Sequence, residues 1–238
     1  QQSSSASVAA YQADAENRLL ARGSRFRLDS EMIRDQILFV SGSLNQSLYG
    51  KSVKPPQPPN LWKSVSMVSS STYAFAADRG GDIYRRSLYS FWKRAMPPPQ
   101  MTIFDAPTRE SCIARRERTN TPVQALVLMN EEQYFRAAKR FAARLLADRQ
   151  MTDDQRLRLA YETVTSHQPD ADELTTLRGG LTSLRAAYAA DLPAAKAMTA
   201  DNASVDNEAA DDAWRIEIAA YTMLVNSLFN LDVAKTRE

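Results

Sequence analysis

Capping signals for helices punctuate the second half of this chain and constrain its fold more than any other feature. At three places a hydroxyl or carboxylate side chain is followed three positions later by glutamine or glutamate: Thr121 with Gln124, Thr152 with Gln155, and Asp170 with Glu173. This is the spacing of a capping box, in which two side chains satisfy free backbone N–H groups where a helix begins. Pro122 suits a first helical position, because its missing N–H would have no partner there. With the apolar periodicity that follows, these signals predict a helix from Pro122, a restart or kink at 130–133, and helices at 131–148, 153–165, 171–190 and 212–231.

Helix signals are sparser in the first half. Apolar residues recur there at helical spacing from Ile33 to Leu44, with Asp29 in position to act as the N-cap. This pattern predicts a helix from Ser30 to about Leu44. Two other helices are predicted, one at 14–22 with Gly23 as its stop, and one from the cap Asp82 through Arg94, ended by the prolines at 97–99.

Proline shapes the segment between these helices. Residues 51–62 contain four prolines, whose fixed φ and missing N–H exclude a helix or a central strand. We expect an extended chain on the surface, held in place by Trp62. Residues 64–77 are polar and only weakly alternating, which fits a short strand or irregular structure.

Composition agrees with a helical protein. The 238 residues include only 7 glycines, and 44% hydrophobic and 24% charged residues are ordinary for a globular domain. The predicted fold is mainly α: an irregular helical domain with long proline-rich loops and little or no sheet. We expect a flexible lead-in at 1–13 and a single helical domain at 14–238.

Charge is distributed unevenly along the chain. Residues 85–118 hold eight basic residues against three acids, whereas residues 191–212 hold six acids against one lysine. The acidic stretch is also rich in alanine, and we interpret it as an exposed, mobile loop. Because the basic and acidic segments could face each other, neither requires an external partner.

An arginine cluster directly before the helix at Pro122 is the strongest candidate site. A helix N-terminus presents unpaired N–H groups, and guanidinium groups suit carboxylate, sulfate or phosphate. An anion pocket here would use Arg115, Arg116, Arg118, Thr119 and Asn120. The alternative, which we prefer, is an internal network that fixes a loop, because structural ion pairs give the same pattern. The acids available for that network are Asp105, Glu110, Glu117 and Asp35.

Other kinds of site find little support. His167 and Cys112 are the only histidine and cysteine, so the chain has no usual zinc or haem ligand set, and we expect no cofactor. A catalytic triad would depend on His167, which has no nucleophile elbow nearby. No pair of carboxylates is favoured by its spacing for glycoside hydrolysis, and no glycine-rich phosphate loop is present. Bases and aromatics alternate in residues 84–94, but helical spacing explains this better than nucleic-acid binding.

The ends of the chain indicate a fragment. No apolar run is long enough to span a bilayer, and no signal peptide is visible at Gln1. The chain does not begin with methionine, so we expect it to be a processed or truncated piece of a longer protein.

Several motifs resemble the planctomycete PSD domain, a family of unknown function. They are residues 84–94, Pro97-Pro98, 104–107, 115–122 with 124–126, and the shorter matches at 16–20, 27–29 with 33–35, 53–55 and 228–238. Such domains form the C-terminal part of large exported proteins, often downstream of a cytochrome c-like domain, and are associated with polysaccharide breakdown. The resemblance therefore implies a periplasmic or extracellular location. It supplies no catalytic residues, and no haem is expected in this chain.

Three functions follow as hypotheses. The first is a non-catalytic interaction or scaffold domain, whose partners are other domains of the same protein or a protein complex. The second is a glycan- or anion-binding module, with Arg116 and Arg118 as ligands for sulfate or uronate groups of an acidic glycan. The third is a carbohydrate-active enzyme domain, which requires a pocket near residues 105–120. We expect neither a nucleic-acid partner nor a membrane span in this chain.

Overall fold

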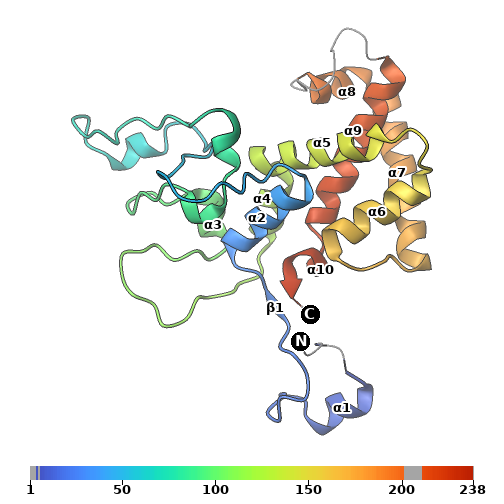
Figure 1. Ribbon diagram of the computed structural model, residues 1–238, viewed down its shortest axis with the longest axis horizontal. Helices are drawn as coiled ribbons and strands as arrows, with labels where there is room; N and C mark the ends of the chain where they lie inside the picture. Colours follow the sequence, from blue (N-terminus) through green and yellow to red (C-terminus); the bar gives the residue numbers. More distant parts are fainter. Residues whose placement is uncertain (1–3, 5, 201–210, 238) are drawn as a thin grey trace.

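The structure is a computed structural model that describes residues 4, 6–200 and 211–237. Within these residues the fold is mainly α, as predicted, with a single two-stranded sheet (Figure 1). Strands β1 (Phe26–Arg27) and β2 (Thr236–Arg237) pair antiparallel. The α-helices are α1 (Val8–Ala13), α2 (Ser30–Val40), α3 (Pro99–Ile103), α4 (Pro122–Asn130), α5 (Glu132–Ala147), α6 (Asp153–Thr165), α7 (Ala171–Ala190), α8 (Leu192–Thr199), α9 (Asp212–Phe229) and α10 (Asp232–Lys235).

The core forms around α9. This helix packs against α5, α7 and α8, and its buried face includes Ile218, Tyr221 and Val225. Helix α5 supplies Phe141 and Leu145 to the same hydrophobic cluster. Large apolar side chains buried at helical spacing on both helices give this interface its stability. The helices of the second half therefore form most of the core, and the long loops of the first half lie to one side of it (Figure 1).

The caps predicted at Thr152 and Asp170 are confirmed, whereas Asp29 stands at the N-cap position of α2 without a side-chain hydrogen bond to the helix. Thr152 accepts a hydrogen bond from the Gln155 N–H at 3.3 Å, and Asp170 accepts one from the Glu173 N–H at 2.8 Å. Helix α4 begins at Pro122. The expected break follows at Glu131, whose extended backbone separates α4 from α5 and whose carboxylate accepts from the Tyr134 N–H. Capping residues therefore set these helix boundaries.

The helix predicted from Asp82 to Arg94 was wrong. The segment forms two 3-10 turns, η2 (Gly80–Tyr84) and η3 (Ser87–Tyr89), joined by extended residues. An α-helix would use the Ile83 carbonyl and the Ser87 N–H for one internal bond. Here that carbonyl accepts from Arg34, and that N–H donates to Asp35, both on α2. Tertiary hydrogen bonds have replaced the helical ones, and Leu88, expected on the apolar face, is 72% exposed.

The proline-rich segment has no α-helix, as predicted, but it turns at residues 59–61, where Asn60 has a φ of +65°; Trp62 anchors it, as expected. The Trp62 side chain is buried, and its ring lies 5.0 Å from that of Phe75 and 5.6 Å from that of Phe91. The segment also pairs with residues 82–94, through a β-bridge between Val53 and Ser90. Residues 64–77 contain the end of the 3-10 turn η1 (Trp62–Val65) and are otherwise irregular.

Two helix predictions near the N-terminus need correction. Residues 14–22 form turns instead of a helix, because the Asp14 carboxylate accepts from the N–H groups of Arg18 and Leu19. The helix of this region is α1, which lies within the expected lead-in. Helix α2 stops at Val40 rather than near Leu44, because the chain turns at Gly42 with a φ of +70°.

The predicted acidic loop at 191–212 is partly helical. Residues 192–199 form α8, whose first turn is capped by Asp191 accepting from the Ala194 N–H at 3.0 Å. Residues 201–210 of this predicted loop lie outside the described residues. No helix in the described part of the chain is long and apolar enough to cross a membrane.

Candidate functional site

The predicted arginine segment, residues 115–120, lies against the N-terminus of α2. Arg116 donates from both terminal nitrogens to the Glu31 carboxylate, at 2.7 and 3.1 Å. It also lies 3.5 Å from Asp29, which pairs with Arg118 at 3.5 Å. The guanidinium of Arg118 stacks 4.6 Å from the centre of the Phe26 ring. Two of the predicted anion ligands are thus paired with carboxylates of the chain itself.

Thr119 is engaged as well. Its N–H and hydroxyl both donate to the Asp105 carboxylate, which is also 2.5 Å from Arg27. Arg115 and Asn120 are exposed. Of the acids predicted to pair in this region, Asp105 takes part, whereas the sequence reasoning missed Asp29 and Glu31.

Electrostatics tie the segment to α2. Burial alone would raise the pKa of Glu31, but hydrogen bonds, chiefly from Arg116, outweigh it and lower that pKa. The pKa of Arg116 is raised in turn, mainly by its hydrogen bond to Glu31. An external anion would have to compete with carboxylates that these arginines already bind.

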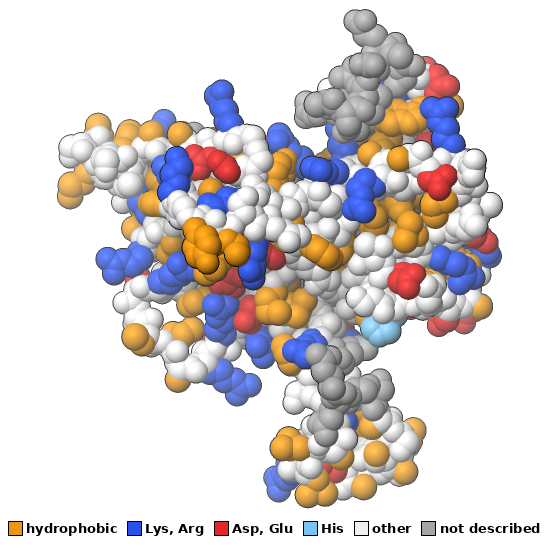
Figure 2. Space-filling view, in the orientation of Figure 1, with side chains coloured by type: hydrophobic (Ala, Val, Ile, Leu, Met, Phe, Trp, Pro, Cys, Tyr) orange, Lys and Arg blue, Asp and Glu red, His pale blue; other side chains and the backbone are white. Residues whose placement is uncertain are grey.

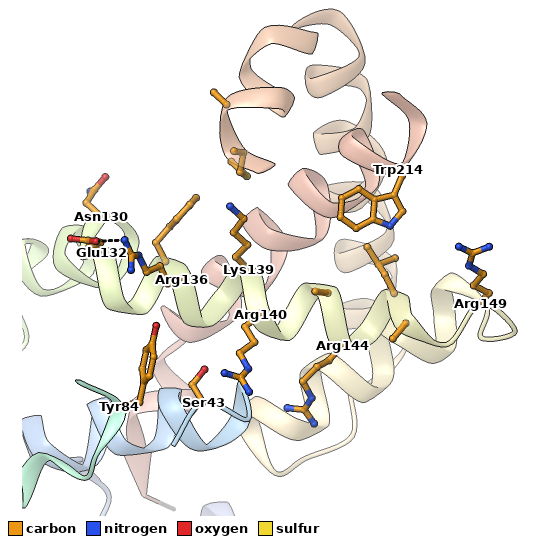
Figure 3. A pocket seen from close by; sticks show the side chains of 16 residues that line it. Ser43, Tyr84, Asn130, Glu132, Arg136, Lys139, Arg140, Arg144, Arg149 and Trp214 are labelled. Atoms are coloured by element: carbon orange, nitrogen blue, oxygen red, sulfur yellow. Dashed lines mark ion pairs between the residues drawn. The ribbon is translucent and has the colours of Figure 1, made fainter. Parts of the chain in front are cut away.

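A second candidate site, with more cations than carboxylates in its described lining, lies along α5. An open groove of about 1420 Å³ runs over this helix, and Figure 3 shows the Lys and Arg side chains that line it; Figure 2 shows Lys and Arg side chains on this face of the molecule. Its charged lining residues are five cations and one carboxylate, namely Arg136, Lys139, Arg140, Arg144, Arg149 and Glu132. We call this site the α5 groove.

Three of the cations form a row on one face of the helix. Arg136, Arg140 and Arg144 are spaced four residues apart, so they follow one another at about 6 Å along the axis. Like charges at this spacing repel each other across successive turns. We call these residues the arginine row.

The members of the row differ in what they contact. Arg136 pairs with Glu132 at 2.6 Å, and Arg144 donates to the Val40 carbonyl at 2.8 Å, at the C-terminus of α2. Arg140 is exposed and makes no ion pair with the described residues. Lys139, the cation next to it, is buried. Arg140 is therefore the member of the row whose charge is most available to a ligand.

The walls of the groove come from distant parts of the chain. Ser43 and Tyr84 lie on one side of α5, and Trp214 lies on the other side (Figure 3). The floor includes an apolar stripe of Phe135, Ala143 and Leu146, each half-buried. The groove thus combines a row of positive charge with a strip of apolar surface.

Sequence reasoning missed this site. It treated the run from Asn130 to Leu146 as a helix and assigned no role to its basic residues. The signal was present, because cations at 136, 140 and 144 recur with helical spacing. Among the described residues, no group of three or more His, Cys, Asp and Glu side chains is placed to hold a metal ion.

Comparison with known proteins identifies a family and little else. No curated protein and no solved structure matches the chain. A match to the family PSD1, described as "Protein of unknown function (DUF1553)", covers residues 1–181 of the 238. That span includes the arginine segment and all of α5, and it ends within α7. The chain therefore belongs to the PSD1 family, as its motifs suggested.

Proposed function

We propose that this chain is a non-catalytic interaction domain of an exported multidomain protein, and that it binds an anionic partner in the α5 groove. The observation that carries the proposal is the arginine row, in which Arg140 is exposed and has no acidic partner among the described residues. The partner would be another domain of the same protein or a component of a complex.

Physical chemistry favours an anion here. Each pair of like charges four residues apart on a helix costs about 0.2–0.5 kcal/mol, and a bound carboxylate, sulfate or phosphate removes that cost. Guanidinium groups also bind such anions through two parallel hydrogen bonds. A partner that covers the apolar floor beside the row would exclude water there and so strengthen each charge interaction.

A second candidate is an acidic glycan bound at Arg115–Asn120. The observation in its favour is that Arg115 is exposed and makes no ion pair with the described residues. Against it, Arg116 and Arg118 already bind Asp29 and Glu31, so a glycan would have to displace those carboxylates. The enzyme hypothesis required a pocket near residues 105–120, and none of those residues lines the α5 groove.

The wider setting of the proposal rests on the family resemblance. A periplasmic or extracellular location, an associated cytochrome c-like domain and a link to polysaccharide breakdown belong to this part of the proposal. The interaction itself needs no cofactor in this chain.

A thermal-shift experiment tests the proposal. The probes are poly-L-glutamate, heparin and polygalacturonate, with neutral dextran as the control at constant ionic strength. A ligand present at a hundred times its dissociation constant stabilises the folded state by about 2.7 kcal/mol. For a domain of this size that corresponds to a rise of roughly 5–10 °C in Tm. We expect at least one anionic polymer to give such a rise and dextran to give none.

Matched variants locate the binding. Arg140→Ala should abolish the rise, whereas Arg158→Ala should keep it, because Arg158 is an exposed helical arginine on α6 outside the groove. Loss of the rise in Arg115→Ala alone would place the site at the arginine segment instead. If no anionic polymer stabilises the chain, the proposal is wrong.

A further inference from the structure

The α5 groove is lined by two parallel surfaces of different chemistry. The arginine row occupies one face of α5, and the apolar stripe of Phe135, Ala143 and Leu146 occupies the adjoining face, with the buried Lys139 between Phe135 and Ala143. All three stripe residues are only half-buried, although Ala143 and Leu146 also pack against the core. A ligand that satisfied only the arginines would leave this apolar surface in water.

Trp214 and Met198 extend the apolar surface across the groove. Both are half-buried and come from α9 and α8, and Trp214 lies on the opposite wall from Tyr84 (Figure 3). Ala143, at the edge of the stripe, and Ala147, one turn further along α5, have small side chains that allow another backbone to approach closely. The groove therefore has an apolar floor, a small-residue seam and a basic rim.

The size of the groove favours an extended occupant. Sites for small molecules usually enclose about 300–1,000 Å³, and the α5 groove is an open site of about 1420 Å³. The lining residues on this part of the chain run from Asn130 to Arg149, so the groove spans the full length of α5. A segment several turns long can lie beside this helix.

We infer that the occupant of the α5 groove is an acidic amphipathic helix of a protein partner, which places its apolar face on the Phe135–Leu146 stripe and its carboxylates on the arginine row. This inference rests on the function proposed above and specifies the class of partner. Helices that bind grooves do so with apolar residues at i, i+3, i+4 and i+7, and the stripe offers them apolar contacts at Phe135, Ala143 and Leu146. Carboxylates one turn apart on the partner have nearly the spacing of Arg136, Arg140 and Arg144.

An acidic polysaccharide fits the groove less well. Its sugar rings carry hydroxyl groups, and burying them against Phe135 and Leu146 removes their hydrogen bonds to water without replacement. A single-stranded nucleic acid would use stacked aromatic rings along its path, whereas the aromatic residues of the described lining are Trp214 and Tyr84, on opposite walls, and Phe135 on the floor. The apolar stripe therefore favours an amphipathic helix over these polyanions as the occupant of the groove.

Two synthetic peptides of identical composition test the inference. The first is an 18-residue peptide of Glu, Ala and Leu with leucines at helical spacing, and the second contains the same residues in shuffled order. Binding of each fluorescently labelled peptide to the whole chain is measured by anisotropy, with poly-L-glutamate and heparin as competitors. We expect the amphipathic peptide to bind at least tenfold more tightly than its shuffled isomer.

Variants of the two surfaces provide the controls. Arg140→Glu should weaken binding of the amphipathic peptide at least tenfold, and Arg158→Glu, with the same change of net charge, should leave it within twofold. Ala147→Gln tests the seam at an exposed position without a change of charge, and Leu146→Ala tests the stripe. Circular dichroism checks that each variant is folded. Both of these groove variants should weaken the amphipathic peptide more than they weaken poly-L-glutamate.

The outcomes separate this inference from the proposed function. Equal binding of both peptides, or tighter binding of heparin than of the amphipathic peptide, overturns the inference and leaves an anion-binding groove. Binding that Arg140→Glu does not reduce overturns both. If neither peptide nor any polyanion binds, both are also overturned.

Discussion

Arg116 holds the carboxylate of Glu31 with both of its terminal nitrogens, at 2.7 and 3.1 Å. This bidentate pair fixes the loop before α4 to the first turn of α2, between segments 85 residues apart in sequence. A carboxylate in the first turn of a helix is also favoured by the helix dipole. Arg116, which the sequence suggested as an anion ligand, thus binds a carboxylate of the chain itself.

Replacement of Glu31 should make this contact measurable. We expect Glu31→Gln to lower the free energy of unfolding by about 1–2 kcal/mol at pH 7, since the pair is charge-assisted and only partly exposed. The comparison is by urea denaturation, with Glu110→Gln, an exposed acid of the same loop, as the control. A loss no larger than that of the control would show that the pair does not hold the loop.

The same pair should give a pH dependence of known sign. The pKa of Glu31 is lowered in the folded state from its usual value of 4.5. Its stabilisation is therefore complete above that value and is lost as the pH falls through the lower, folded pKa. The difference in unfolding free energy between wild type and Glu31→Gln should be constant from pH 6 to 7 and shrink below about pH 4.5. A difference that grew on acidification would contradict the assignment.

Arg34 should be the most sensitive charged residue in the fold. Its side chain is fully buried, and it donates to Gln133 at 2.7 Å and to the carbonyls of Ile83 and Arg85 at 2.8 and 2.9 Å. Arg34→Met leaves buried acceptors without donors, so we expect a loss of about 3–5 kcal/mol. Hydrogen exchange should show residues 83–90 losing protection first.

Arg86 is the natural control for that experiment. Like Arg34, it lies near Asp35, but its side chain is 52% exposed and the distance between the two charged groups is long, at 3.8 Å. Arg86→Ala should cost no more than about 1 kcal/mol. Comparable effects of the two substitutions would mean that the buried hydrogen bonds of Arg34 do not organise the 83–90 segment.

Two glycines should respond in opposite directions. At Gly42 the φ is +70°, and an added Cβ would lie 2.9 Å from the Arg144 Nη1 that binds the Val40 carbonyl. Gly179 lies inside α7, and no neighbouring atom is within 4 Å of the position that an added Cβ would take there. We expect Gly42→Ala to destabilise by about 1–2 kcal/mol and Gly179→Ala to stabilise by about 0.5–1 kcal/mol. Urea midpoints at unchanged slope give both values, and the same sign for both would refute the backbone account.

The helices of the second half could be predicted from sequence because local chemistry decides them. The expected ranges 153–165 and 171–190 are those of α6 and α7, since each cap lies next to the N–H groups that it satisfies. The segment 82–94 could not be predicted in this way. Its backbone groups bond to Arg34 and Asp35, and no local pattern shows that a distant arginine will take a carbonyl.

The candidate site was predictable only in part. The cation spacing on α5 is visible in the sequence, and a helix from 131 was expected. The groove also needs Ser43, Tyr84 and Trp214 as walls, and their positions depend on the packing of α5 against α2 and α9. Pairing of Arg116 with Glu31 likewise depends on tertiary structure, so the sequence could not show which arginines remain available.

The affinity of labelled poly-L-glutamate for wild type, Arg140→Glu and Arg158→Glu tests the central claim, that the α5 groove binds anions, most directly. The two variants have the same net charge, so a difference between them reports position and not overall charge. At low ionic strength we predict that wild type and Arg158→Glu bind within twofold of each other and that Arg140→Glu binds at least tenfold more weakly, a difference of about 1.4 kcal/mol. Equal affinities of the two variants would contradict the claim.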